Sequence, residues 1–156
     1  MYKILFVCTG ATCRSPMAHA MFSHKYRQYH LLNVRSNFCG LNVEYGSGIN
    51  ERSKEALHEY GITRVCGSPA QIDGRLLSEY NIIICMTEDQ KEALQVMVAD
   101  NFVSKIACMK DFCGYDIPDP YGGSREEYHN CLKLIETAIE KIIEVLLGNG
   151  IAKRKK

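Results

Sequence analysis

The stretch Val7-Cys8-Thr9-Gly10-Ala11-Thr12-Cys13-Arg14-Ser15-Pro16 decides the fold, because it joins a predicted strand to a predicted helix. The run Ile4-Leu5-Phe6-Val7 is continuous and apolar, which is typical of a strand buried on both faces of a parallel sheet. Ser15 suits an N-cap and Pro16 suits the first helical position, so we expect a helix to begin there. A loop closed in this way turns its backbone amides inward, and the helix dipole helps them to bind an anion.

Cys8 and Arg14 are the first candidates for chemistry in this loop. Chance alone gives about 0.4 matches to the Cys-x5-Arg spacing in this chain, so the Gly and Ser-Pro context carries the prediction. A helix N-terminus, inward amides and a guanidinium favour the thiolate form of a cysteine. We therefore expect Cys8 to attack phosphorus and form a phosphocysteine, while the planar fork of Arg14 holds two phosphoryl oxygens. The Ser15 hydroxyl can stabilise that thiolate. The alternative is an ordinary buried cysteine beside a surface arginine.

A thiolate nucleophile needs a separate proton donor for the leaving group. The segment Asp116-Ile117-Pro118-Asp119-Pro120-Tyr121-Gly122-Gly123 offers one, and the prolines on both sides of Asp119 stiffen it in an extended conformation. We expect Asp119 to act as the general acid and then as the base that activates water. Asp116 is a weaker competitor, and a turn-forming role for Asp119 is the alternative.

Together, the motif at residues 7–16 and Asp-Pro-Tyr at 119–121 resemble the low molecular weight protein tyrosine phosphatases, over nearly the whole chain. The resemblance implies a single flavodoxin-like α/β domain with a four-stranded parallel sheet and helices on both faces. It implies two-step hydrolysis of phosphotyrosine without a metal or cofactor, with Cys8 as nucleophile, Arg14 as phosphate binder and Asp119 as acid. It also implies that Cys13 can form a protective, reversible disulfide with Cys8. The remaining residues of the phosphate-binding loop are Thr9, Gly10, Ala11, Thr12 and Ser15.

Two residues of the loop depart from the family pattern. Family members usually carry Asn where this chain has Ala11, and an Ala held at positive φ costs about 1 to 2 kcal/mol. Many members have a bulky aliphatic residue in place of Thr12. Thr12 resembles the protein-arginine phosphatase branch, as do Thr9, Pro16-Met17-Ala18 and the run at 119–124. Thr12 can contact a guanidinium leaving group, so phosphoarginine is an alternative substrate, although Thr12 can also be a simple loop residue.

The phosphoryl group of the substrate is expected to enter a pocket whose walls contact the rest of the substrate. Tyr121, beside the expected acid, is our candidate for one aromatic wall. In this family the other wall comes from the loop after the second strand, here residues 37–50, where Tyr45 is the candidate. His19 replaces a Glu common in the family, and we expect it to be solvated.

The rest of the chain predicts alternating strands and helices. We expect strands at 33–36, 81–86 and 105–109, and helices at 50–60, after the capping box that begins at Thr87, and after Ser124. This alternation is typical of a parallel sheet with right-handed crossovers. Ligands of such sheets bind at the carboxyl ends of strands, where Cys8 falls.

The composition indicates the number of domains, the kinds of partner and the cell compartment. The 156 residues are 46% hydrophobic with a net charge of +1, which predicts one domain at 1–150 and no drive toward nucleic acid or membrane. We expect a disordered basic tail at 151–156. No apolar run is long enough for a secretory signal or a membrane span, so we expect a cytoplasmic protein. We also expect a monomer that acts on a phosphorylated protein or peptide. The eight cysteines are expected to be reduced, and none has zinc-ligand spacing.

Two other classes of protein can carry such a loop. Thiol-linked arsenate reductases share the Cys-x5-Arg loop on this fold, but they relay oxidation through two further cysteines near the third strand. Here that region offers only Cys85, within an apolar run, and the next cysteine is Cys108. The second class is a catalytically inactive phosphate-binding module, which the joint presence of Cys8, Arg14 and Asp119 disfavours.

Overall fold

Four parallel strands form the centre of the protein in this computed structural model, which describes residues 1–156. They are β1 (Tyr2–Cys8), β3 (Val34–Gly40), β4 (Ile82–Cys85) and β5 (Ile106–Cys108). Their order across the sheet is β3-β1-β4-β5, which is the flavodoxin-like arrangement. Cys8 at the end of β1 lies opposite Gly40 at the end of β3, so the carboxyl ends of these strands meet at one edge.

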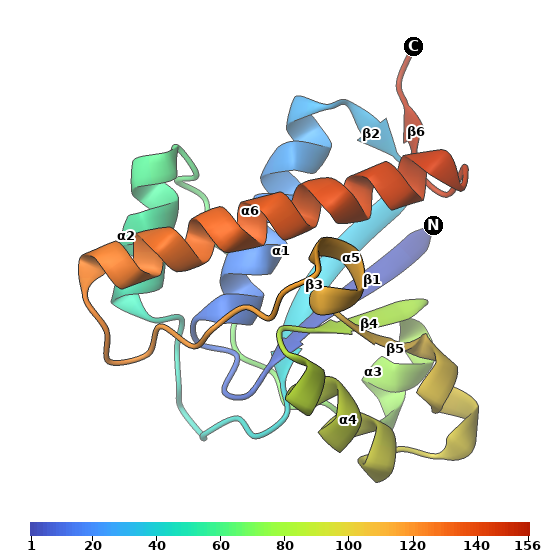
Figure 1. Cartoon of the computed structure of the whole chain (residues 1–156), viewed down its shortest axis with the longest axis horizontal. Helices are drawn as coiled ribbons and strands as arrows, with labels where there is room; N and C mark the ends of the chain where they lie inside the picture. The colour runs from blue at the N-terminus through green and yellow to red at the C-terminus, as the bar shows by residue number, and fades with distance from the viewer.

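Helices cover both faces of this sheet (Figure 1). One face is covered by α1 (Arg14–Gln28), α2 (Glu51–Tyr60) and α6 (Arg125–Gly148), and the other by α3 (Gly74–Glu79) and α4 (Glu88–Met97). A 3-10 helix, η1 (Asp100–Lys105), precedes β5, and the short α5 (Lys110–Cys113) follows it and packs against α6. The predicted α/β class, with four parallel strands between two helical layers, is confirmed.

The alternation of side chains along β1 explains its continuous apolar sequence. Ile4, Phe6 and Cys8 point into the larger core with α1 and α6, whereas Leu5 and Val7 point into the smaller core with α3 and α4. All five are buried. A strand buried on both faces therefore delivers Cys8 to the side from which α1 departs.

The signals for helix boundaries are confirmed at several places. The Asn50 side chain accepts a hydrogen bond from the Arg52 N–H and caps α2, which ends at Gly61 in the left-handed conformation. Thr87 and Gln90 form the predicted capping box of α4, and Ser124 caps α6. The strand predicted at 33–36 is longer than expected, because residues 37–40, assigned to the following loop, pair with β1 up to its end and complete β3.

The start of α1 differs from the prediction. Cys13, rather than Ser15, occupies the N-cap position, and its side chain makes no capping hydrogen bond. Ser15 lies inside the first turn, where its hydroxyl approaches Cys8 instead. Pro16 is the third helical residue, which is tolerated because the first N–H groups of a helix have no partner within it.

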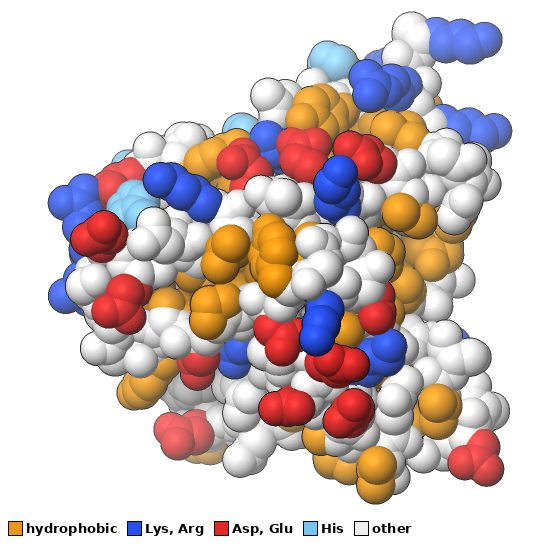
Figure 2. Space-filling model, viewed as in Figure 1, with side chains coloured by type: hydrophobic (Ala, Val, Ile, Leu, Met, Phe, Trp, Pro, Cys, Tyr) orange, Lys and Arg blue, Asp and Glu red, His pale blue; other side chains and the backbone are white.

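The C-terminal residues also differ from the expected disordered tail. Lys153–Arg154 form a short strand, β6, which pairs antiparallel with β2 (Leu31–Leu32). The Lys155 N–H donates to the His30 carbonyl, and Ala152 is buried, so these contacts fix the tail. Lys and Arg side chains gather at this end of the molecule, away from the carboxyl ends of the strands (Figure 2). No helix in the structure has the length and apolar character that crossing a membrane requires.

His19 is more enclosed than expected for a surface residue. Its Nδ1 lies 2.8 Å from the Ser36 hydroxyl, and its ring packs against Phe38. Burial, and then the positive charge of Arg27, lower its pKa to about 4. The folded protein therefore holds His19 in the neutral form in mildly acidic solution.

The lowered pKa predicts acid sensitivity. The unfolded chain binds a proton at His19 near pH 6.5 and the folded chain only near pH 4, so stability that is present above pH 6.5 is lost as the pH falls toward 4. Between pH 7 and pH 5, proton binding to His19 in the unfolded chain should lower the free energy of unfolding by about 2 kcal/mol. Urea unfolding at pH 7 and pH 5 measures this loss. Between these two pH values His19→Asn should lose less stability than the wild type. Equal losses in the two proteins would contradict the assignment, and His30→Asn, at an exposed position, is the control.

Candidate active site

A pocket of about 490 Å³ opens at the carboxyl ends of the strands. Three segments far apart in sequence line it: the loop after β1, the loop between β3 and α2, and the segment before α6. Among the predicted residues, those that line it are Cys8, Thr9, Gly10, Thr12, Cys13, Arg14, Asp119 and Tyr121. Ala11 and Ser15 are buried beneath the loop. Tyr45 is fully exposed and does not line the pocket, which corrects its expected role as a wall.

The backbone of the loop is arranged for an anion. None of the N–H groups of residues 9–14 donates a hydrogen bond within the protein. Buried or half-buried amides without a partner are uncommon, and a group of them at a helix N-terminus is a binding site for a phosphate-like ligand. Cys8 lies in the lining of the same pocket, so an anion held by these amides is within reach of its sulfur.

Ser15 supports the Cys8 sulfur from below. The Ser15 N–H donates to Cys8 Sγ at 3.4 Å, and the Ser15 hydroxyl lies 3.1 Å from Cys8 Sγ and 3.2 Å from the Cys39 carbonyl. The hydroxyl has one proton. It donates to the carbonyl while Cys8 is a thiol, and it can turn to Cys8 when the sulfur is a thiolate. Two donors then face the sulfur, which favours its charged form.

Arg14 joins the loop to the segment that carries Asp119. Its side chain is 6% exposed, and its Nη1 donates to the Ile117 carbonyl at 2.9 Å. Its Nη2 lies 3.8 Å from Asp119 Oδ2, although the Asp119 side chain is 55% exposed. Asp119 Oδ1 also accepts from the Tyr121 N–H. The guanidinium is thus held at the pocket, and the carboxylate stands at its open side.

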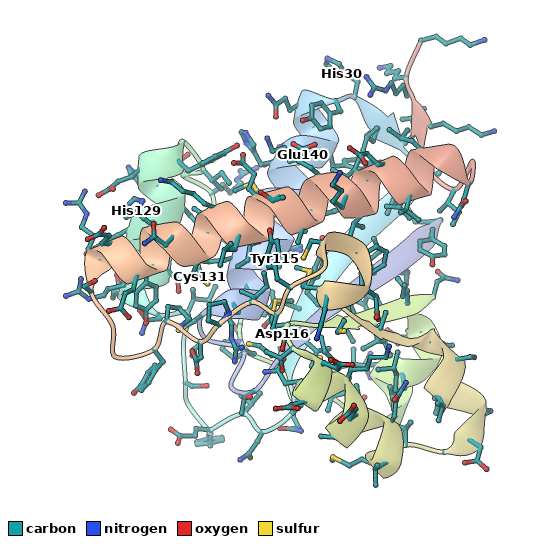
Figure 3. The ribbon with its side chains drawn as sticks, in the orientation of Figure 1. His30, Tyr115, Asp116, His129, Cys131 and Glu140 are labelled. Atoms are coloured by element: carbon teal, nitrogen blue, oxygen red, sulfur yellow. The ribbon has the colours of Figure 1, made fainter.

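Asp116 occupies a different place from Asp119. Figure 3 shows Asp116 on the segment after α5, close to the start of α4. Its Oδ1 accepts a hydrogen bond from the Glu88 N–H at 2.9 Å, and it does not line the pocket. A carboxylate at a helix N-terminus stabilises that helix, so Asp116 stabilises the start of α4 and takes no part in the pocket.

Gln90 is a residue at the site that sequence reasoning missed. It is buried at the start of α4, and its Oε1 accepts from the Met86 and Thr87 N–H groups. Its Nε2 donates to the Thr9 hydroxyl at 3.1 Å. The capping box indicated that Gln90 would face back toward the strand end, but only the fold shows that it meets the loop.

Close backbone approach also holds the loop. Ala11 is fully buried with φ of 56°, so the positive φ expected from the family comparison is present at an alanine. Gly40, at the end of β3, lies against it. A Cβ on Gly40 would stand 2.8 Å from the Thr9 carbonyl and 3.0 Å from the Ala11 nitrogen, so only glycine fits there.

The loop after β3 is fastened to the phosphate-binding loop by backbone hydrogen bonds. The N–H groups of Leu41, Asn42 and Asn50 donate to the carbonyls of Cys8, Thr9 and Thr12, respectively, at 2.8 to 2.9 Å. These bonds bring the polar side chains of residues 42–50 to the pocket.

The two cysteines of the phosphate-binding motif are both free thiols in this structure, Cys8 and Cys13. Cys13 Sγ faces the buried Tyr128 hydroxyl at 3.5 Å.

Replacing Gln90 with Leu tests the support of the loop. The variant keeps the volume of the side chain but removes three hydrogen bonds, so the loop should lose its fixed shape. We expect kcat/KM on p-nitrophenyl phosphate to fall about 10-fold, which corresponds to about 1.4 kcal/mol. The matched control is Gln95→Leu, at a residue of α4 that does not line the pocket. Equal activities of the two variants would contradict the role of Gln90.

Comparison with known proteins agrees with this geometry. A model of the low molecular weight phosphotyrosine protein phosphatase family matches residues 3–153. A protein-arginine-phosphatase from Geobacillus stearothermophilus is 33% identical over 151 residues, which cover 93% of this chain and 96% of that protein. A low molecular weight protein-tyrosine-phosphatase from Streptomyces coelicolor is 28% identical over 149 residues, which cover 88% of each.

Solved structures show the same relationship. A low molecular weight phosphotyrosine phosphatase from Vibrio cholerae superposes with a TM-score of 0.91 at 25% identity, covering 97% of this chain and 100% of that one. An arginine phosphatase from Geobacillus stearothermophilus superposes with a TM-score of 0.87 at 30% identity, covering 97% and 96%. The fold, the anion-binding loop after β1 and the match over nearly all of its length together show that this chain belongs to the low molecular weight phosphotyrosine protein phosphatase family of cysteine-dependent phosphoric monoester hydrolases.

Proposed function

We propose that this protein hydrolyses phosphotyrosine in proteins or peptides through a phosphocysteine on Cys8. The observation that carries the proposal is the single pocket that brings together a thiol, a guanidinium and a carboxylate. Cys8 ends β1 and Arg14 begins α1, on either side of the phosphate-binding loop, and Asp119 comes from a segment more than a hundred residues later. Six free backbone amides surround the place where the phosphoryl group would bind.

In the first step the Cys8 thiolate attacks phosphorus and forms an S–P bond, while the P–O bond to the tyrosine oxygen breaks. The loop amides and Arg14 hold the equatorial oxygens, on which charge spreads in the transition state. Asp119 donates its proton to the leaving phenolic oxygen. This role fits the position of its carboxylate at the open side of the pocket, where the leaving group must stand.

In the second step water attacks the phosphorus of the phosphocysteine. The Asp119 carboxylate takes a proton from that water, the S–P bond breaks, and inorganic phosphate is released. Cys8 leaves as a thiolate, and the Ser15 hydroxyl and N–H stabilise it as they did before attack.

Phosphoarginine is the second candidate substrate, and Thr12 is the observation that favours it. The Thr12 side chain lines the pocket, and its hydroxyl has only a weak partner, Cys13 Sγ at 3.7 Å. A hydroxyl in this position can contact the nitrogens of a guanidinium leaving group, whereas a bulky aliphatic side chain would favour a flat phenol.

The experiment that tests the function compares kcat/KM on matched phosphotyrosine and phosphoarginine peptides with neutral flanks, near pH 6 to 7. Preference for phosphotyrosine supports the main proposal, and preference for phosphoarginine supports the second. Thr12→Ile should then lower activity selectively on phosphoarginine, and an equal effect on both peptides would exclude a discriminating role for Thr12. If neither peptide shows turnover that depends on Cys8, both proposed substrates are excluded. The remaining hypothesis is then a catalytically inactive phosphate-binding module.

The remaining thiols favour hydrolysis over arsenate reduction. Burial, and then neighbouring Cys108, raise the pKa of Cys85 to about 12, and both thiols lie in the core. Such thiols are poor relays for oxidation. We also propose that the protein acts as a monomer in the reducing cytoplasm, where Cys8 would stay reduced and able to react. Assay of arsenate reduction with thioredoxin, and sedimentation of the purified protein, test these points.

A further inference from the structure

The pocket wall formed by the loop after β3 is polar and acidic. Its members are Asn42, Glu44, Ser47, Gly48 and Asn50. Tyr121 is the one aromatic side chain in the lining, and it is 72% exposed on the segment before α6. In Figure 1 the loop between β3 and α2 and the segment before α6 lie at the same end of the sheet. A flat phenol is best held between apolar or aromatic walls, and the loop after β3 offers hydrogen-bond acceptors instead.

Glu44 stands on this wall without a cationic partner. Asp119, the other carboxylate in the pocket lining, lies 3.8 Å from Arg14, and Glu51, just after this loop, pairs with Lys54. The position of Glu44 is fixed by a turn in which its carbonyl accepts from the Ser47 N–H, and by the flanking backbone bonds of Asn42 and Asn50 to the phosphate-binding loop. The same turn leaves the Ser47 hydroxyl buried without a hydrogen-bond partner. The Glu44 carboxylate is therefore an acceptor on this wall that no cationic side chain of the protein pairs with.

Charge in the pocket is divided between its floor and its rim. The floor carries the free amides and Arg14, which suit a phosphoryl group. The rim carries two exposed carboxylates, those of Asp119 and Glu44. A ligand with an anionic end and a cationic, N–H-donating part beside it matches this division, whereas a neutral peptide around phosphotyrosine leaves Glu44 unpaired.

We propose that Glu44, assisted by Asn42, is a specificity-determining residue that selects substrates with a guanidinium group beside the phosphoryl group. The inference rests on the phosphatase function proposed for Cys8. A planar guanidinium presents several N–H donors that match a carboxylate and an amide oxygen. It has two possible sources, the phosphorylated arginine itself and an arginine that flanks a phosphotyrosine. Because the guanidinium is already charged in the bound substrate, Glu44 contacts it both before and during the reaction, so the contact strengthens binding and acts mainly on KM.

Glu44→Gln tests the inference, because it keeps the size of the side chain and removes its charge. Glu55→Gln, at an exposed position on α2 outside the pocket, is the matched control. Four substrates are compared: p-nitrophenyl phosphate, a phosphotyrosine peptide with neutral flanks, the same peptide with flanking arginine, and a phosphoarginine peptide with neutral flanks. We expect Glu44→Gln to lower kcat/KM about 3-fold to 10-fold on at least one guanidinium-bearing substrate, mostly through KM, and less than about 2-fold on the other substrates. The difference should shrink as salt is raised.

The pattern across substrates identifies the source of the guanidinium. A loss confined to the phosphoarginine peptide assigns Glu44 to the leaving group, and a loss confined to the arginine-flanked peptide assigns it to the flank. Equal losses on all four substrates, or effects no larger than those of Glu55→Gln, would overturn the inference while turnover of p-nitrophenyl phosphate leaves the phosphatase function intact. Binding of the same peptides to Cys8→Ser, with and without Glu44→Gln, measures the contact even where turnover is absent.

Discussion

Cys8→Ser should lower kcat on p-nitrophenyl phosphate by about 10⁴-fold or more, because the proposed reaction has no other nucleophile. A serine hydroxyl stays protonated where a cysteine sulfur can ionise, and the donors around Cys8 stabilise a thiolate but include no base to activate a hydroxyl. The free amides and Arg14 are unchanged in this variant. Affinity for inorganic phosphate should therefore stay within about 3-fold of the wild type, which separates loss of chemistry from loss of binding.

Cys66→Ser is the matched control, since Cys66 is exposed and lies outside the pocket. It should keep full activity. Rapid acid quenching of the wild type during turnover, followed by mass spectrometry, should find a phosphoryl group on the peptide that contains Cys8. Residual activity of Cys8→Ser within about 10-fold of the wild type, or a phosphoryl group on another residue, would refute the nucleophile assignment.

Much of the fold follows from local patterns in the sequence. The apolar run of β1, the capping residues Asn50, Thr87 and Ser124, and the glycine at position 61 act through neighbours in the chain, so a pattern can predict them. The short strand β6 could not be predicted in this way. Its two charged residues resemble a solvated tail, and they become ordered only because Leu31–Leu32 lie beside them in the folded protein.

The residues of the candidate site also fall into two groups, those that local sequence motifs predict and those that only the fold brings to the pocket. Cys8, Arg14 and Asp119 belong to compact motifs whose chemistry can be read from residue type and spacing, and the structure brings them to one pocket. Gln90 and Glu44 carry no motif. Gln90 meets Thr9 across 81 positions of sequence, and Glu44 reaches the pocket only because backbone bonds fasten its loop.

Tyr45 shows why residue type alone misleads in a loop. The family resemblance places an aromatic wall of the pocket in the loop at residues 37–50, and Tyr45 is the candidate for it in this chain. The turn from Glu44 to Ser47, with Gly46 at φ of 77°, instead directs Tyr45 into solvent and leaves its polar neighbours on the pocket side. The backbone conformation of the turn, rather than hydrophobicity, decides which residues form the wall.

Asp119→Asn should lower kcat by about 10² to 10³-fold on phenyl phosphate, because the amide cannot protonate the departing oxygen. The reduction should be much smaller for the first step with p-nitrophenyl phosphate, whose leaving group departs without a proton. With that substrate the second step should become rate-limiting, since the variant also lacks the base that activates water. Pre-steady-state measurement should then show a burst of p-nitrophenol close to one equivalent per enzyme.

Asp116→Asn is the control for Asp119→Asn, because it changes the neighbouring carboxylate in the same segment without touching the pocket. Its cost should appear in the stability of α4, at about 1 kcal/mol or less, while kcat stays near the wild-type value. The dependence on leaving group decides the assignment. If Asp119→Asn slows phenyl phosphate and p-nitrophenyl phosphate equally without a burst, Asp119 acts by holding Arg14 across their 3.8 Å contact and not by transferring a proton.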